Sequence, residues 1–207
     1  MDLTPLFALR LRTPRLELRL ATPEHIVALY RLAAAGIHPP DEIPFAVAWT
    51  DALNEHDFVG YHEGLLRAWA PGHWHAAFVS LLDGCVVGTQ SLLGRDFAAR
   101  REVGSGSWLG RAWQGRGLGT EQRAAVLELA FRGLGARAAA TGAIWDNLAS
   151  QRVSQKLGYR VIAEGTISPR GTPLRRLDYR LDAAEWRSPF VVEIEGLEDA
   201  LPLFGLR

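Results

Sequence analysis

The sequence predicts an α+β fold, in which helices pack on a single β-sheet. The predicted elements follow the order strand, two helices, three strands, helix, strand, helix and two strands, which lacks the strict alternation of a doubly wound fold. Asp83-Gly84 is a strong turn dipeptide between two runs rich in Val, Phe and Leu, so it predicts a hairpin. With 207 residues, 48% of them hydrophobic, the chain is expected to bury one core and to form a single domain over residues 1–207.

The first third of the chain predicts one strand and two helices. Leucines alternate with polar residues at 16–20, the period of a half-buried strand. Thr-Pro-Glu at 22–24 supplies an N-cap, a first-turn proline and an early acid for a helix at about 23–34. Apolar residues at helical spacing predict a second helix at about 54–69. The loop between the two helices is unusually apolar at 44–49 and is a candidate pocket wall.

The middle of the chain predicts three strands. The hairpin around Asp83-Gly84 consists of strands at about 75–82 and 85–93, and a third strand is expected at about 102–109. Gly104 and Gly106 interrupt that third strand. Because glycine offers no side chain to pack, these positions suggest a bulge or a close approach of a ligand to the backbone.

Past a glycine-rich loop, helices and strands alternate. Asp146-Asn147 offers an N-cap, and Gly158 is a plausible C-cap eleven residues later. The elements expected here are a helix at about 119–132, a strand at about 136–144, a helix ending near Leu157, a strand through Val161 and Ile162, and a strand at about 175–181. The C-terminal tail, residues 188–207, receives no assigned element.

Composition narrows the class of function. Acidic and basic residues balance at 23 each, so no net field attracts nucleic acid or an anionic membrane. Cys85 is the only cysteine, which excludes an internal disulfide and a cysteine-built metal site, and no metal is expected. No apolar run approaches the roughly 20 residues that a membrane-spanning helix needs, and no signal pattern is visible, so a cytoplasmic location is expected.

The loop at 114–119, Gln-Gly-Arg-Gly-Leu-Gly, precedes the predicted helix at 119–132. Glycines let backbone N–H groups turn inward, and a helix N-terminus favours negative charge, so this segment predicts an anion site. Arg116 adds a side chain suited to phosphate. The Gly-Lys-Ser/Thr ending of nucleotide hydrolases is absent, and Thr120 stands where the dinucleotide fingerprint has its third glycine, so both common nucleotide-loop interpretations fail.

Two motifs in this order resemble a known superfamily. The loop at 114–119 resembles the Q/R-x-x-G-x-G/A signature of the GNAT acyltransferases. Asn147-Leu148-Ala149-Ser150 and Lys156-Leu157-Gly158-Tyr159 are similar to the N-x-x-S and K-L-G-F/Y elements of the branch that includes the ribosomal-protein N-terminal acetyltransferases. The resemblance is strong at about 102–164. It implies a mixed, mostly antiparallel sheet with a splayed strand pair, flanked by about four helices.

The resemblance also implies the chemistry, namely transfer of an acyl group, by default acetyl, from acetyl-CoA or another acyl-CoA to a primary amine in a ternary complex. The pantetheine arm of the coenzyme would pair with the strand at 102–109 where it splays from the strand at 136–144. Backbone N–H groups near Trp108 or Leu109 would stabilise the oxyanion. The residues that the resemblance assigns to the coenzyme are Ser107, Trp108, Leu109, Gln114, Gly115, Arg116, Gly117, Leu118, Gly119, Thr120, Asn147 and Ser150.

Three of these side chains carry open assignments. Asn147 fits a contact to the coenzyme arm and equally a helix N-cap, and Ser150 shares that ambiguity. At Ser154 many superfamily members have a tyrosine that protonates the departing thiolate. A serine hydroxyl is a far weaker acid, so Ser154 is expected to act only as a hydrogen-bond donor to sulfur, or to be a structural serine.

The acceptor and the general base stay open at this level. Residues 37–72 are expected to form the acceptor side, and Trp49, Trp69 and Trp74 are candidates for lining its pocket. The acceptor is a small-molecule or peptide amine. No spacing selects a base among the candidates, which are Glu102, Asp41, Glu42, His38, His56, His62, His73 and His75.

Three alternatives accompany this interpretation. Succinyl-CoA is an alternative donor, with Arg95 or Arg111 as a partner for its carboxylate. A CoA-binding module without catalysis is a second, favoured only by the missing tyrosine at 154. The apolar residues of the tail would either cover the domain or contact a second subunit in a homodimer; they are Phe190, Val191, Val192, Leu201, Leu203 and Phe204.

Overall fold

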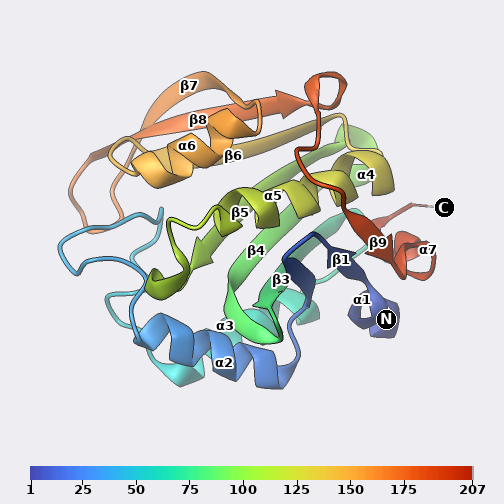
Figure 1. The fold of residues 1–207 in the computed structure, drawn as a ribbon, viewed down its shortest axis with the longest axis horizontal. Coiled ribbons are helices and arrows are strands. Elements are labelled where there is room, and N and C mark those ends of the chain that lie inside the picture. The colour runs from blue at the N-terminus through green and yellow to red at the C-terminus, as the bar shows by residue number, and fades with distance from the viewer. Residues whose placement is uncertain (207) are drawn as a thin grey trace.

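The computed structural model describes residues 1–206, so the last residue of the predicted tail, 207, lies outside the described residues. A nine-stranded sheet runs through the molecule in the order β7-β8-β6-β5-β4-β3-β2-β1-β9 (Figure 1). Only β5 and β6 pair in parallel, which confirms the mixed, mostly antiparallel sheet. The strands are β1 Arg10–Arg12, β2 Leu16–Leu20, β3 His73–Leu82, β4 Cys85–Arg95, β5 Glu102–Leu109, β6 Ala138–Ile144, β7 Arg160–Ile167, β8 Leu174–Asp182 and β9 Glu193–Glu195.

Four longer helices match the four expected. They are α2 Pro23–Ala34, α3 Glu55–Arg67, α5 Leu118–Glu128 and α6 Leu148–Lys156. A π-helical turn, η2 Leu129–Gly133, extends α5. The short helices escaped sequence analysis because three to five residues show no helical period; these are α1 Thr4–Ala8, α4 Phe97–Arg100, α7 Leu197–Ala200 and the 3-10 turns η1 Arg111–Trp113, η3 Ala183–Glu185 and η4 Leu201–Phe204. No helix within residues 1–206 is long and apolar enough to cross a membrane.

Each face of the sheet has its own apolar core. On β3, Ala76 and Phe78 belong to the core that contains α5, whereas Val79 and Leu81 belong to the core under α2 and α3. This alternation follows from the two-residue period of a strand. Figure 1 accordingly shows α2 and α3 on one side of the sheet and α5 and α6 on the other.

The hairpin between β3 and β4 turns where Asp83-Gly84 predicts it. Both turn residues have positive φ, 49° and 79°, as a tight two-residue hairpin requires. The bulge suggested within β5 is absent, because the β4–β5 register runs unbroken from Gly88↔Leu109 to Gly94↔Val103. Gly104 instead allows close packing, since a Cβ there would lie 3.0 Å from the Leu93 side chain.

Strands β5 and β6 separate after a short parallel ladder. They pair only at Glu102–Gly104 and Ala138–Ala140; beyond these residues β5 continues along β4, and β6 continues along β8. The Thr141 hydroxyl donates to the Ser105 carbonyl at 3.0 Å where the strands diverge. The splay that the resemblance implies is therefore present, and it leaves one backbone edge of β5 without a strand partner.

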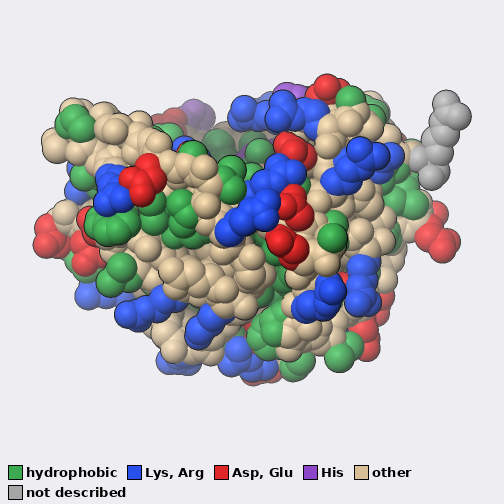
Figure 2. All heavy atoms as spheres, turned by 90° about the horizontal axis from the view of Figure 1, so that it is seen from above, with side chains coloured by type: hydrophobic (Ala, Val, Ile, Leu, Met, Phe, Trp, Pro, Cys, Tyr) green, Lys and Arg blue, Asp and Glu red, His purple; other side chains and the backbone are tan. Residues whose placement is uncertain are grey.

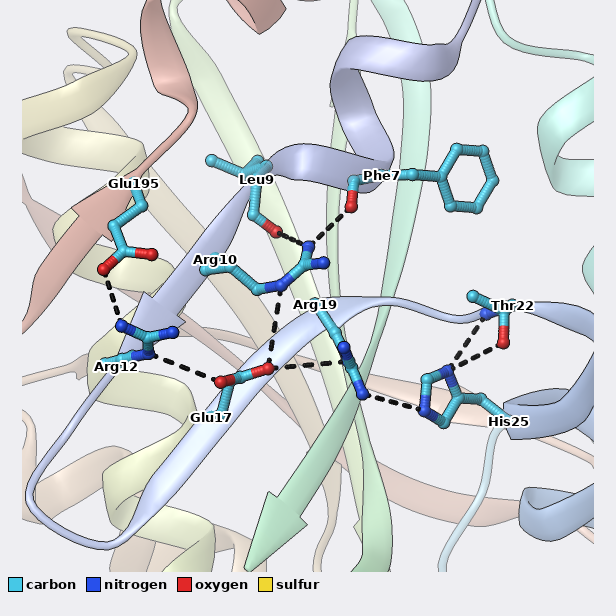
Figure 3. Close-up of polar contacts among 9 residues, drawn as sticks. All are labelled: Phe7, Leu9, Arg10, Arg12, Glu17, Arg19, Thr22, His25 and Glu195. Carbon is cyan, nitrogen blue, oxygen red and sulfur yellow. Dashed lines mark hydrogen bonds and ion pairs between the residues drawn. The ribbon is translucent and has the colours of Figure 1, made fainter. Parts of the chain in front are cut away.

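The tail folds back onto the N-terminal edge of the sheet. Strand β9 pairs with β1, with Leu11 opposite Ile194. Figure 3 shows the polar contacts at this edge, where Arg12 bonds Glu195 at 2.6 Å and Glu17 lies among Arg10, Arg12 and Arg19. After α7 the chain brings Phe204 into the core, where its ring packs edge-on against Trp74.

Candidate active site

The glycine loop enters α5 as predicted. Gly115 and Gly117 have φ of 73° and 80°, the left-handed conformation that glycine adopts at little cost, and Gly117 is the N-cap of α5. Within residues 1–206, no acceptor bonds the backbone N–H groups of Gly117, Leu118 or Gly119. The loop is exposed, and a Cβ on Gly115 would meet only open space. These features leave the N–H groups of the loop accessible, as the predicted anion site requires.

An ion pair between buried Glu121 and partly exposed Arg15 fixes the loop to the sheet. Glu121, in the first turn of α5, has 0% exposure and accepts hydrogen bonds from the Thr13 hydroxyl at 2.7 Å and from Arg15 Nε at 2.7 Å. Arg15 also donates to the Arg116 carbonyl at 3.1 Å. Sequence analysis missed Arg15, because nothing local links it to a residue about a hundred positions later.

Two other loop side chains have clear positions. Gln114 donates to the Ile37 carbonyl at 2.7 Å and to the Leu109 carbonyl at 2.8 Å, so it joins the loop both to the end of β5 and to the segment before α3. The Arg116 guanidinium lies over the Trp113 ring at 5.2 Å and is exposed. Its charge is therefore available beside the unpaired N–H groups.

The free edge of β5 presents backbone groups from alternate residues. The Gly110 N–H donates to the Val87 carbonyl, and a Cβ on Gly88 would overlap the Trp108 carbonyl. The backbone polar groups of residues 108 and 110 therefore face β4. The Ser105 carbonyl bonds Thr141 of β6 and so points the other way. Because the N–H and C=O of one strand residue share a direction that alternates along the strand, the Leu109 N–H faces the gap and the Trp108 N–H faces β4.

The residues predicted on α6 border the gap. Asn147 caps α6, accepting the Ser150 N–H at 3.0 Å, so its N-cap role is realised. Ser154 is fully buried, and its hydroxyl donates to the Ser150 carbonyl at 3.1 Å. Arg123 of α5 donates to Ser154 Oγ at 3.0 Å and to Ser107 Oγ at 3.3 Å. Ser154 thus uses its one proton within its helix, and sequence analysis missed Arg123.

A cavity of about 450 Å³ lies on the other face of β5. It is bounded by three segments of the chain, namely α3, the loop before it and the central strands. Trp49 is central, with ring centroids of Phe45, Phe58 and Trp108 at 5.1, 5.9 and 6.0 Å. The lining residues are Phe45, Ala46, Val47, Trp49, Ala52, Leu53, Asn54, Asp57, Phe58, Tyr61, His62, Ala77, Thr89, Ser91, Gly106, Ser107 and Trp108.

The loop at 44–49 forms a pocket wall, as its apolar sequence predicts, and Trp49 lines the cavity. The prediction that Trp69 and Trp74 also line the acceptor pocket is wrong. These two rings stack at 6.0 Å and are 5% and 3% exposed, and their indole N–H groups donate to the carbonyls of Leu203 and Phe204. A tryptophan in a sequence fits a packing role as well as a binding role. The contacts with the C-terminal tail show that these two pack in the core.

Of the predicted base candidates, only His62 lines the cavity. Burial lowers the pKa of His62 to about 4, with a smaller contribution from nearby His75, so its imidazole is neutral at pH 7 and a weak proton acceptor. Glu102 lies at the opposite end of β5, and its hydrogen bond from Arg180 lowers the pKa of its carboxyl. His38 bonds Thr50 and the Pro39 carbonyl in the loop before α3.

Charge around the site is balanced and local. Figure 2 shows basic side chains in separate groups with acidic ones among them, without a continuous basic band. Neither Arg95 nor Arg111 lines the cavity. Within residues 1–206, no group of three or more His, Cys, Asp or Glu side chains is placed to hold a metal ion.

Comparison with known proteins identifies the family of this chain and structures with a similar fold. The model of the acetyltransferase (GNAT) domain family matches residues 15–160. RimJ from Mycobacterium smegmatis, solved in complex with CoA-disulfide, superimposes with a TM-score of 0.73 at 18% identity, over 96% of this chain and 95% of that one. RimL, a ribosomal L7/L12 alpha-N-protein acetyltransferase solved with coenzyme A, gives 0.65 at 16% identity, over 82% and 94%. At these identities the structural likeness establishes the fold.

Proposed function

This chain belongs to the GNAT acetyltransferase family, and on that basis we propose that it moves the acetyl group of acetyl-CoA to a primary amine by direct attack in a ternary complex. The observation that carries the proposal is that two sets of backbone groups are left without a backbone partner in the described part of the chain. One set is the N–H groups of Gly117, Leu118 and Gly119, and the other lies on the edge of β5 beside the gap, where the Leu109 N–H faces away from β4.

In this proposal the coenzyme lies along these two sets of groups. Its pyrophosphate bonds the N–H groups of the glycine loop, and Arg116 leaves the Trp113 ring to pair with a phosphate. Its pantetheine arm pairs with the edge at Ser107, because the Leu109 carbonyl already accepts a hydrogen bond from Gln114. Contacts from Thr120, Asn147 and Ser150 stay predictions; those from Asn147 would add to its capping role.

The chemical step then follows from the backbone. The Leu109 N–H, which faces the gap, donates to the thioester oxygen and stabilises the oxyanion by roughly 3 kcal/mol. The nitrogen lone pair attacks the carbonyl carbon, the carbon–sulfur bond breaks, and sulfur leaves as a thiolate while the amine proton passes to water. A water path suits the site, because His62 is a weak base at neutral pH.

The cavity lining contains neither lysine nor arginine to pair with a succinyl carboxylate, so acetyl-CoA is retained as the donor. Arg123, which bonds Ser107 beside the gap, would be the partner for a succinyl carboxylate, and the titration below tests that alternative. The acceptor enters from the side of residues 37–72. RimL is described as acting on a protein α-amine, which makes a peptide amine a candidate beside small-molecule amines.

Calorimetric titration with acetyl-, succinyl- and free CoA tests the proposal. Gly117→Trp, which fills the space of the pyrophosphate, should abolish micromolar binding of acetyl-CoA. Gly84→Trp is the matched control, because Gly84 has φ of 79° against 80° at Gly117 but lies in the β3–β4 turn. If the wild-type protein binds none of the three compounds, the proposed function is wrong. Binding without acetyl transfer to any amine would support the catalytically silent module.

A further inference from the structure

The aromatic cavity indicates the class of acceptor. Trp49 stands among three aromatic rings, and its neighbours Phe45 and Trp108 reach the cavity from different segments. The floor is formed by small side chains of the central strands, Ala77, Thr89 and Ser91. A cavity of about 450 Å³ with this lining accommodates an apolar group the size of an aromatic ring.

Charge in the cavity points the same way. Asp57 is the only carboxylate of the lining, and its Oδ2 already accepts a hydrogen bond from Asn54 at 2.7 Å. A polyamine or an aminosugar carries several cationic groups and would leave most of them unpaired here. A monoamine needs only one deprotonated nitrogen near the Leu109 N–H of β5, where the thioester carbonyl is proposed to lie.

Resting on the proposed function, we infer that the acceptor is a monoamine that carries an apolar, ring-sized group. The group occupies the cavity around Trp49, and the nitrogen faces β5. Free arylalkylamines and peptides with an aromatic or large aliphatic first residue share this chemistry.

Acetyl transfer from acetyl-CoA is measured with phenethylamine, tryptamine and a peptide amide beginning with Phe, each against spermidine and a peptide beginning with Ser. The apolar amines should exceed the others at least tenfold in kcat/KM, and the better of the two apolar forms distinguishes a free amine from a peptide. Ser91→Leu, which fills the floor, should raise the acceptor KM at least tenfold without changing the Kd of acetyl-CoA. Cys85→Leu, exposed on the same strand, is the matched control.

The two proposals fail separately. Absence of acetyl-CoA binding overturns the proposed function. Intact binding with preferred acetylation of spermidine or the Ser peptide overturns the acceptor inference alone, as does an unchanged acceptor KM in Ser91→Leu.

A second, independent observation concerns a buried cation. Arg123 is 3% exposed, and no ion pair within the described residues includes it. Its Nε lacks any hydrogen-bond partner, as do the nearby Tyr159 hydroxyl and Ser105 Oγ. Burial raises the pKa of Tyr159, so this phenol remains neutral. A buried charge without a counter-ion is unfavourable, which calls for an anion that arrives with a substrate.

The anion that the proposed reaction creates beside Arg123 is the coenzyme thiolate. Arg123 donates to the hydroxyls of Ser107 on β5 and Ser154 on α6. The Ser154 hydroxyl donates a hydrogen bond to the Ser150 carbonyl, whereas the Ser107 hydroxyl has no acceptor within residues 1–206. Ser107 also borders the cavity. Ser107 is therefore the hydroxyl able to donate to sulfur.

We propose that Arg123 is a positioning residue that orients the Ser107 hydroxyl toward the sulfur and whose positive charge stabilises the departing thiolate. When the carbon–sulfur bond breaks, both electrons go to sulfur, the Ser107 O–H bonds it without transferring its proton, and solvent later protonates the free thiolate.

The test follows the ultraviolet thiolate absorbance of bound CoA as pH is varied. The thiol of CoA bound to the wild-type protein should titrate about one pH unit or more below the thiol of free CoA measured in the same buffer. Arg123→Met and Ser107→Ala should each return the bound thiol toward that value and lower kcat at least tenfold, with a smaller change in KM for acetyl-CoA. Arg123→Lys should recover part of kcat.

Thermal melting separates this role from a structural one, because methionine at a buried, unpaired cation should leave Tm unchanged or raise it. An unchanged thiol titration and kcat in Ser107→Ala overturn the proposal, even if Arg123→Met does not fold. Failure of the wild-type protein to bind CoA would instead overturn the proposed function.

Discussion

Glu121 joins the first turn of α5 to the segment before β2. Its carboxylate has 0% exposure and is held by Thr13 and Arg15. Glu121→Ala removes the acceptor of the Thr13 hydroxyl and of Arg15 and leaves space in the core, so it should lower the free energy of unfolding by about 1–3 kcal/mol in urea denaturation. The exposed pair Glu63–Arg67 supplies the control, since Glu63→Ala should change stability by no more than about 0.5 kcal/mol. Equal losses in both variants would contradict a special role for Glu121.

His62 should make stability depend on pH. Its folded pKa is about 4 against 6.5 for the unfolded residue, so its contribution is complete above pH 6.5 and is lost as pH falls toward 4. The free energy of unfolding should fall by about 2 kcal/mol between pH 7 and 5 through this residue alone. His62→Phe should remove that part of the slope in denaturation measured at both pH values. The exposed His56 on the same helix provides the control, and His56→Phe should keep the wild-type slope.

At the residue scale, the predictable part of the site is the part encoded locally. Glycines at a helix start and an asparagine before α6 carry their conformational reasons in neighbouring residues. Arg15 and Arg123 could not be found in this way, because their partners come from distant segments. The chain has 23 basic residues, one of them lysine and 22 arginine, and nothing in the sequence distinguishes these two from the other arginines.

At the scale of elements, the contact between β4 and β5 sets the place of the backbone donor. A Cβ on Gly88 would overlap the Trp108 carbonyl and lie 2.9 Å from the Leu109 Cα. Gly88→Ala should therefore displace β5, destabilise the fold by about 1–3 kcal/mol and lower kcat more than it weakens coenzyme binding. Gly165→Ala in β7, where a Cβ meets nothing within 4 Å, is the matched control. Unchanged kcat in Gly88→Ala would contradict the assignment of Leu109.

Element boundaries were predictable where local signals are strong. The bounds of β2, α2 and β5 agree with the sequence prediction, because leucine alternation, the Thr-Pro-Glu start and the flanking loops are all local. The three-residue strands β1 and β9 were not predicted. Each is too short for a period to show. Within residues 1–206, β9 pairs only with β1, from the opposite end of the chain, and β1 lies between β2 and β9.

At the scale of the whole molecule, the tail completes the core. Phe204 is fully buried, with its ring 5.5 Å from Trp69 and 4.9 Å from Trp74. Phe204→Ala should lower the free energy of unfolding by about 3–5 kcal/mol, measured by urea denaturation followed through tryptophan fluorescence. Val191, 78% exposed in the same tail, is the control, and Val191→Ala should be within about 0.5 kcal/mol of the wild type. A small effect of Phe204→Ala would mean that the tail only rests on the surface.

This use of the tail bears on assembly. Leu203 and Phe204, two of the residues predicted to cover the domain or to contact a second subunit, are buried within their own chain. A homodimer stays a prediction, which light scattering at several concentrations would reject by giving only the monomer mass.

The pairing of β9 with β1 also orders events during synthesis. Arg12 and Glu195, bonded across this edge, are 183 residues apart in sequence. β1 leaves the ribosome long before β9 has been synthesised, so the edge of β1 has no strand partner during that time. An exposed strand edge of this kind promotes pairing between molecules. β1 is short, and Arg10, Arg12, Arg19 and Glu17 place charges along it and β2, both of which disfavour pairing with another chain. The charge cluster of Figure 3 therefore protects the edge during synthesis and stabilises it in the folded protein.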